Sequence, residues 1–173
     1  MNRLGVVGCG LMGSGIAEVA AKSRCDVLVV DTTDEILTKA AVRINTSLAK
    51  AQEKGKLDEP ADVIFGRITF TTDLKAMGDR EIVIEAIREA IADKATLLER
   101  LDAIVSDACI IGSNTSSIPI ATIAAASRRP DRIVGIHFFN PVPVMPLVEV
   151  ISALQTAPAV ADAAADFCAN VLG

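Results

Sequence analysis

The chain of 173 residues has no tryptophan, no tyrosine and one histidine, and aromatic residues make up only 3% of it. The absence of tyrosine excludes enzymes that use a Tyr/Lys pair as the proton donor. One histidine cannot complete the sets of side chains that usually coordinate zinc, and the cysteines show no C-x-x-C spacing. No metal is therefore expected. We expect buried, reduced thiols at the four cysteines, Cys9, Cys25, Cys109 and Cys168.

Other absences concern charge and long apolar runs. The net charge is −5 at pH 7 and no basic tract has interleaved aromatic residues, so nucleic acid is not an expected partner. No apolar run approaches the roughly 18 to 20 residues of a membrane span. The first strand is expected to begin by Arg3, which leaves no room for a signal peptide, and we expect a cytoplasmic protein. With 51% hydrophobic residues, the chain can form one globular unit over 1–173.

A glycine-rich turn follows the first apolar strand and leads into an alanine-rich helix. Gly8, Gly10 and Gly13 form the pattern G-x-G-x-x-G. The first glycine allows a tight turn, the second lets the backbone approach a pyrophosphate, and the third lets the helix pack closely on the strand. The residues predicted to form this cofactor loop are Gly8, Cys9, Gly10, Leu11, Met12 and Gly13.

An acidic residue ends the second predicted strand. Asp31 lies 23 residues after Gly8, near the spacing of the acid that binds an adenine ribose. Its carboxylate would accept hydrogen bonds from a free 2′-hydroxyl and repel a 2′-phosphate, so NAD is favoured over NADP. The alternative, a glycine-rich turn with an incidental aspartate, is disfavoured because strand, glycines, helix, strand and acid all occur in order.

The single histidine, His137, opens a proline-rich segment that ends at Glu149. Histidine moves protons near neutral pH, and a carboxylate within reach fixes its tautomer and stabilises its charged form. The apolar run 133–136 predicts a buried strand and 147–151 the next one, with three prolines holding the connection extended. His137 would then lie at a strand end with Glu149 on the neighbouring strand. The alternative is a histidine satisfied inside the core and a glutamate at a strand edge.

Strand and helix patterns alternate along the chain. We expect strands near 3–8, 26–31, 67–71, 81–85, 109–113, 133–138 and 147–151, and helices near 13–23, 34–53, 90–106, 117–127 and 158–172. This alternation predicts an α/β fold with a doubly wound, mostly parallel sheet, whose ligand crevice lies at the carboxyl ends of the strands. Four polar residues fall at such ends, namely Asp31, Glu85, Ser113 and His137.

One connection is longer than a crossover helix requires. After Asp31, helical spacing over 34–54 is followed by a lysine-glycine turn and a short helix near 58–65, which predicts a protruding helical hairpin. Ser47 and Lys54 are seven residues apart and lie on one face of the first helix. They could bind a phosphorylated carrier, and a solvated helix end with ordinary surface lysines explains the spacing equally well.

Four segments together resemble, in order and spacing, the (3S)-3-hydroxyacyl-CoA dehydrogenases, most closely the bacterial 3-hydroxybutyryl-CoA type. They are the glycine loop from Gly8, Glu85-Ala-Ile-Arg-Glu89 with Lys94, Ser113-Asn-Thr-Ser116-Ser-Ile, and the segment His137 to Glu149. The resemblance covers the whole chain. It implies a Rossmann-type fold, NAD as cofactor, and oxidation of a 3-hydroxyacyl-CoA in β-oxidation or short-chain acyl-CoA metabolism.

The resemblance also implies roles for individual residues. His137 matches the catalytic base, Glu149 its orienting partner, and Ser116 the hydroxyl that binds the substrate's 3-oxygen. Glu89, Lys94, Ser116 and Asn140 match positions around the nicotinamide, and Ser47, Lys54 and Ser116 match coenzyme A contacts. From the local pattern, Ser116 also fits a helix N-cap.

Family members continue beyond the equivalent of Gly173 into an all-helical domain that closes over the substrate and forms a homodimer. We therefore expect residues 1–173 to be the NAD-binding domain alone, which folds and binds NAD but has little or no turnover by itself. Two alternatives stay open. The chain could be an NAD-binding module without turnover, or a dehydrogenase of this fold that acts on an acyl-carrier-protein thioester or a free hydroxy acid.

Overall fold

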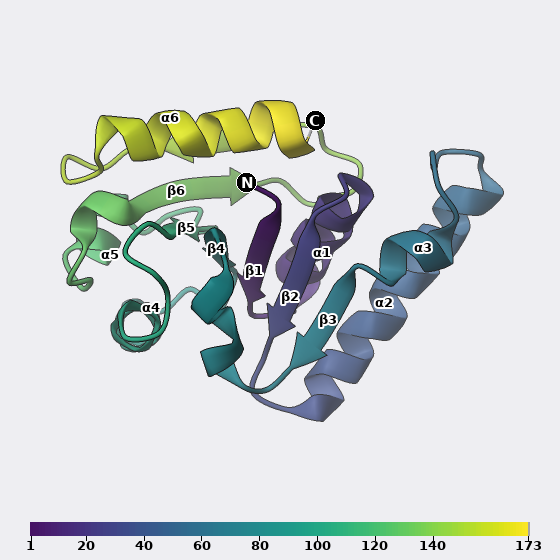
Figure 1. Ribbon diagram of the computed structural model, residues 1–173, viewed down its shortest axis with the longest axis horizontal. Coiled ribbons are helices and arrows are strands. Elements are labelled where there is room, and N and C mark those ends of the chain that lie inside the picture. The colour runs from purple at the N-terminus through teal and green to yellow at the C-terminus, as the bar shows by residue number, and fades with distance from the viewer. Residues whose placement is uncertain (173) are drawn as a thin grey trace.

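The computed structural model describes residues 1–172 as a seven-stranded sheet with helices on both faces (Figure 1). The strand order is β3-β2-β1-β4-β5-β6-β7; β1 to β6 are parallel, and β7 pairs antiparallel with β6. The strands are β1 (Arg3–Val7), β2 (Asp26–Val30), β3 (Ile68–Thr71), β4 (Ile82–Glu85), β5 (Ile110–Ser113), β6 (Ile133–Phe138) and β7 (Val148–Ile151). The predicted doubly wound, mostly parallel sheet is confirmed.

Helices and short helical turns cover the two faces of the sheet, which gives the core two layers. One layer contains α1 (Leu11–Lys22), α2 (Asp34–Glu53), α3 (Ala61–Phe65), α6 (Pro158–Asp166) and the π-helical segment η3 (Phe167–Leu172). The other contains the 3₁₀ helix η1 (Leu74–Asp79), α4 (Ile91–Asp102) and α5 (Ile120–Ala124). A second 3₁₀ turn, η2 (Pro130–Arg132), precedes β6. Because both faces are covered, the central strands are apolar on both sides.

The predicted helical hairpin is present as α2 and α3. Thr33 caps α2, and its hydroxyl accepts a hydrogen bond from the Ile36 N–H at 3.3 Å. After the turn, α3 packs back on α2, and the Ala61 N–H donates to Gln52 Oε1 at 2.7 Å. Figure 1 shows the turn between the two helices projecting away from the sheet.

Several predicted helix limits were wrong. The helix expected at 117–127 spans only 120–124, because residues 115–118 form a turn before Pro119. The helix expected at 90–106 ends at Asp102, and the one expected near 58–65 begins after Pro60. The final helix changes from α to π geometry at Phe167. The two 3₁₀ turns were not predicted.

The connection from β6 to β7 also differs from the prediction. It is not extended throughout, because the Val144 and Met145 N–H groups both donate to the Pro141 carbonyl at 3.0 Å and close a turn. The antiparallel pairing of β6 with β7 explains this difference, since the chain must reverse direction between them.

The four cysteines carry free thiols, three of them buried and Cys168 half-buried. Burial raises the pKa of Cys9 to about 12, and it raises the pKa values of Cys109 and Cys168 to about 11. These thiols are therefore protonated at neutral pH and are weak nucleophiles. Within residues 1–172, no helix has the length and apolar character needed to cross a membrane.

The last helical segment contributes a fully buried ring to the core. Phe167 is 0% exposed, whereas Leu154 is 99% exposed. Phe167→Ala should lower the free energy of unfolding by about 3–5 kcal/mol, because it removes apolar contacts and leaves a cavity. The control Leu154→Ala should change it by less than about 0.5 kcal/mol. Urea denaturation followed by circular dichroism measures both, and equal effects would show that η3 does not belong to the core.

Candidate dinucleotide and proton-transfer site

The sheet brings three predicted polar positions to one edge and one face. Glu85 at the end of β4 lies opposite Ser113 at the end of β5, and Ser113 lies opposite Gly135 in β6. Because side chains alternate along a strand, His137 lies two residues further along β6 on the same face. The prediction that these residues gather at the carboxyl ends of the strands is confirmed.

The glycine loop has the close backbone contacts that its spacing predicts. Gly8 has a φ of +89°, and its N–H donates to the Val30 carbonyl at 2.9 Å. A Cβ at Gly13 would lie 1.8 Å from the Gly8 carbonyl oxygen, so only glycine lets α1 pack this closely. A Cβ at Gly10 would meet nothing within 4 Å. The open space over Gly10, at the N-terminus of α1, fits an approaching pyrophosphate.

Asp31 follows β2 and is fixed by the loop beside it. One carboxylate oxygen accepts from the Cys9 N–H at 2.7 Å, and the other accepts from the Thr32 N–H at 2.7 Å. Burial raises the pKa of Asp31, but the backbone hydrogen bonds outweigh this effect and the pKa is lowered. The group is therefore ionised at neutral pH, in the state that accepts hydrogen bonds from a ribose.

Asp31 and His137 line two adjoining hollows. A hollow of about 780 Å³ contains Asp31, Gly8 and Gly10, and a smaller one of about 330 Å³ contains His137. Both are also lined by Ala86 and Ile87, so the two hollows meet beside the glycine loop. This arrangement can hold an extended dinucleotide with its adenosine near Asp31 and its other end near the imidazole.

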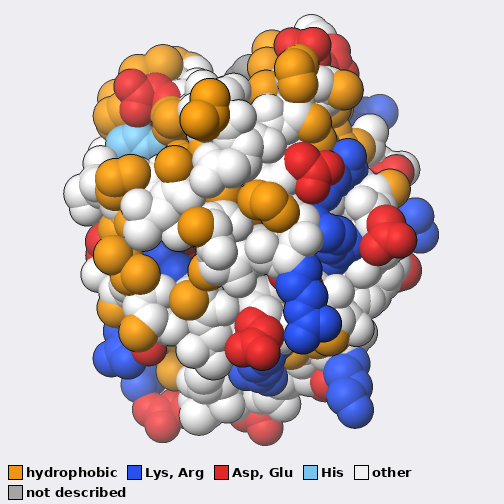
Figure 2. Space-filling model, turned by 90° about the vertical axis from the view of Figure 1, so that its left-hand side faces the viewer, with side chains coloured by type: hydrophobic (Ala, Val, Ile, Leu, Met, Phe, Trp, Pro, Cys, Tyr) orange, Lys and Arg blue, Asp and Glu red, His pale blue; other side chains and the backbone are white. Residues whose placement is uncertain are grey.

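The imidazole of His137 contacts a carboxylate as predicted. His137 and Glu149 are directly opposite in the antiparallel pair of β6 and β7, and Nδ1 lies 2.9 Å from Glu149 Oε2. With Nδ1 donating to Glu149, Nε2 is available to accept a proton. The His137 side chain is 19% exposed and reaches the surface (Figure 2), so the alternative of a histidine enclosed in the core is wrong.

Several predicted residues gather around this imidazole. The smaller hollow is lined by Met12, Glu89, Asn114, Ser116, Phe139 and Asn140 in addition to His137. Ser116 is exposed and does not cap α5; the Thr115 hydroxyl instead accepts hydrogen bonds from the Ser117 and Ile118 N–H groups. The alternative N-cap role of Ser116 is therefore wrong.

Sequence reasoning assigned no role to Asn114, which also lines this hollow. Its side-chain oxygen accepts from the Phe138 N–H at 2.9 Å and ties the ends of β5 and β6 together. It lies inside the motif around Ser116, and its position directly after a strand end is the signal that could have identified it.

Lys94 does not line the hollow, although its motif predicted a position beside the nicotinamide. It is 1% exposed, and its Nζ lies 2.7 and 2.8 Å from the two oxygens of Glu85. Its remaining ionic contact is with Glu89 Oε2 at 3.4 Å. Lys94 is buried because α4 packs directly on the sheet, so it reaches the hollow only through Glu89.

Ser47 lies on α2 and Lys54 directly follows it, and neither residue lines either of the two hollows. The Ser47 hydroxyl donates to Glu18 Oε1 at 3.0 Å, and burial raises the pKa of that carboxyl. Lys54 is the exposed residue that ends α2. The structure thus places Ser47 at the contact between α1 and α2 and Lys54 in solvent.

Sequence reasoning also missed Arg43 of α2. Its Nη1 donates to Ser14 Oγ at 2.7 Å and to the carbonyls of Cys9 and Gly10 at 3.2 and 3.3 Å. These contacts hold the glycine loop from the side of the hairpin and add positive charge near the N-terminus of α1. No sequence spacing links Arg43 to a loop about thirty residues earlier, so only the fold reveals this contact.

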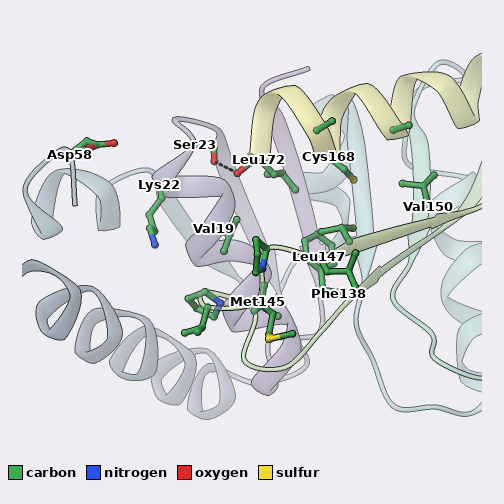
Figure 3. Close-up of a pocket in the computed structure, with 17 residues that line it drawn as sticks. Val19, Lys22, Ser23, Asp58, Phe138, Met145, Leu147, Val150, Cys168 and Leu172 are labelled. Carbon is green, nitrogen blue, oxygen red and sulfur yellow. Dashed lines mark hydrogen bonds between the residues drawn. The ribbon is translucent and has the colours of Figure 1, made fainter. Parts of the chain in front are cut away.

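A third hollow lies on the other face of β6 and β7. It has a volume of about 660 Å³ and lies between α1, the β6–β7 connection and the C-terminal helical segment (Figure 3). Phe138 and Val150 line it, and they alternate with His137 and Glu149 along their strands. The imidazole of His137 therefore points away from this hollow.

Arg43→Ala should weaken NADH binding by roughly 3- to 10-fold, because the glycine loop loses its hydrogen bonds to the guanidinium. Lys39→Ala is the matched control, since Lys39 lies one turn earlier on α2 and pairs only with exposed Glu35. Calorimetric titration with NADH measures both variants. Equal affinities for the two would show that Arg43 does not support the loop.

Comparisons with known proteins agree with this geometry. The family model described as 3-hydroxyacyl-CoA dehydrogenase, NAD binding domain, matches residues 3–173. A 3-hydroxybutyryl-CoA dehydrogenase of Mycobacterium tuberculosis is 46% identical over 175 residues, which cover 100% of this chain and 61% of that protein. A probable 3-hydroxybutyryl-CoA dehydrogenase of Deinococcus radiodurans is 49% identical over 154 residues, 89% of this chain and 55% of that protein.

A solved structure shows the same architecture. The crystal structure of the (S)-3-hydroxybutyryl-CoA dehydrogenase of Ralstonia eutropha matches with a TM-score of 0.95 and 40% identity, over 100% of this chain and 61% of that one. The chain thus spans about six-tenths of the length of these relatives. The match along the whole chain confirms the resemblance drawn from the motifs, and the chain belongs to the family of 3-hydroxyacyl-CoA dehydrogenase NAD-binding domains.

Proposed function

We propose that this protein transfers hydride between NAD and C3 of a (3S)-3-hydroxyacyl-CoA, with 3-hydroxybutyryl-CoA and acetoacetyl-CoA as the pair of substrates. One observation carries the proposal: the His137–Glu149 pair faces a hollow that adjoins the glycine loop. A module that only binds a dinucleotide has no chemical need for a proton acceptor at that position. The names of the relatives support the substrate class.

The residues of the site support a direct mechanism. NAD, when bound, supplies the hydride acceptor. His137 Nε2 takes the proton of the 3-hydroxyl group, and Glu149, 2.9 Å from Nδ1, stabilises the imidazolium that forms. We assign the Ser116 hydroxyl to the substrate's 3-oxygen, and Glu89 and Asn140 to the nicotinamide end of the cofactor. In reverse, the imidazolium returns the proton to the oxygen of a 3-ketoacyl thioester.

We assign Ser47 and Lys54 to the coenzyme A part of the substrate, supported by their motif positions and by the exposure of Lys54. The alternatives are an acyl-carrier-protein thioester or a free hydroxy acid as the substrate. A homodimer of the complete protein, its cytoplasmic location, its place in fatty acid metabolism and a further helical domain stay predictions.

An absorbance assay tests the proposal. The 173-residue chain, with the remaining part of a relative supplied in trans, should oxidise NADH at 340 nm when acetoacetyl-CoA is added. Free acetoacetate should be a much poorer substrate, because it offers no coenzyme A for binding. NADH binding without oxidation, in the presence of that part, would favour the binding module, and equal rates with acetoacetate would contradict the coenzyme A assignment.

The chain should bind NADH more tightly than NADPH, because the Asp31 carboxylate accepts ribose hydroxyls and repels a 2′-phosphate. Asp31→Ala should narrow the difference by weakening NADH binding and strengthening NADPH binding. Calorimetric titration with both nucleotides measures the ratio. Equal or tighter NADPH binding by the unaltered chain would show that Asp31 does not hold the ribose.

In the complete protein, His137→Gln should lower the rate of acetoacetyl-CoA reduction by roughly 10²- to 10⁴-fold, because the acid–base group is lost. NADH affinity should change little, since the glycine loop is untouched. Glu149→Gln should also lower the rate, because the imidazolium loses its countercharge. The assay at 340 nm measures the rate and calorimetry the affinity. A His137→Gln protein with near-full activity would require another base.

A further inference from the structure

Three charged side chains form a cluster beneath the wall of the smaller hollow. The side chain of Glu85 is 0% exposed, that of Lys94 is 2% exposed, and that of Glu89 is 38% exposed. Lys94 Nζ contacts both Glu85 oxygens at 2.7 and 2.8 Å and Glu89 Oε2 at 3.4 Å. Of the three, only Glu89 lines the hollow with His137.

Hydrogen bonds favour the charged form of both carboxylates, and at Glu85 they oppose burial, which raises its pKa. Glu85 presents both oxygens to the ammonium, and one of them also accepts a hydrogen bond from the Ser113 hydroxyl, as an ionised carboxylate does. Glu89 Oε1 accepts from the Thr115 hydroxyl and from the Ser116 N–H at 3.2 Å. Burial raises the pKa of Glu89, but these bonds and the charge of Lys94 outweigh it and the pKa is lowered.

The cluster therefore carries one net negative charge, from two carboxylates and one ammonium. That charge is presented to the hollow by Glu89, because Lys94 contacts both oxygens of the buried Glu85 and only one oxygen of Glu89. The adjacent Arg88 does not cancel it, since its guanidinium pairs with Asp93. If Glu85 were neutral, Lys94 would neutralise Glu89 and the wall would carry no net charge.

We propose that Glu89, only partly compensated because it shares Lys94 with Glu85, makes this site discriminate between the oxidised and reduced nicotinamide rings. The proposal rests on the proposed function, which places the nicotinamide beside His137. Hydride transfer removes the positive charge of the oxidised ring, so a fixed carboxylate attracts NAD⁺ but gains nothing from the neutral ring of NADH. Glu85 and Lys94 are positioning residues that act through Glu89, because neither of them lines the hollow.

The test is the ratio of the dissociation constants for NADH and NAD⁺, measured by calorimetry at low ionic strength. Glu89→Gln should lower this ratio by about 10-fold, as expected for removing one charge close to the ring. Glu85→Gln should lower it in the same direction without any contact with the ligand. Glu89→Asp keeps the charge and should preserve the ratio, even if both affinities fall.

Glu99→Gln is the matched control, because Glu99 is exposed on α4 and its replacement changes the total charge equally. Its ratio should equal that of the unaltered chain. If Glu89→Gln weakens both nucleotides equally, Glu89 acts only as a hydrogen-bond acceptor and the proposal is wrong. This test stands even if Glu85→Gln fails to fold. Absence of binding to either nucleotide by the unaltered chain would instead contradict the proposed function itself.

Discussion

The covering of the sheet on both faces is the constraint on which the rest of this structure depends. Strands buried on both sides must be apolar along their length, as Val27 and Leu28 of β2 are, so polar chemistry can occur only where strands end. Parallel pairing then aligns those ends at one edge. Asp31, Glu85 and His137 come from distant parts of the chain, yet the same rule places all three there.

Two kinds of contact shape the site at this edge of the sheet. Close backbone contacts at Gly8 and Gly13 bring the turn and α1 together and leave open space over Gly10. The antiparallel strand β7 supplies the carboxylate that contacts His137. A parallel strand in its place would need a crossover connection, whereas antiparallel pairing sets Glu149 directly opposite His137 after a connection of nine residues, 139–147.

Local patterns in the sequence predicted the strands, the glycine loop and the pairing of His137 with Glu149, because each depends on neighbouring residues and on period-two alternation. The limits of α2 were also predicted, since its N-cap and its closing glycine turn are local signals. The start of α5 was not predicted, because the turn before it is held by hydrogen bonds that Thr115 and Ser116 donate to the distant Glu89. The contacts of Arg43 with the glycine loop and the burial of Lys94 depend on how the helices pack in the fold. No local sequence pattern predicts that packing.

Glu85, Ser113 and Lys94 are exceptions to the apolar rule within the buried layer. Removing two charges from water costs several kcal/mol per ion, and apolar side chains of similar size often stabilise a fold as well or better. Packing alone therefore does not account for a buried pair at the floor of the site. The second carboxylate, Glu89, offers a reason for the buried pair. Because Glu89 contacts the same ammonium, the pair of Glu85 and Lys94 controls how much negative charge reaches the hollow through Glu89. Among the buried charged groups, this cluster is the one whose charge reaches the space where the chemistry is proposed to occur.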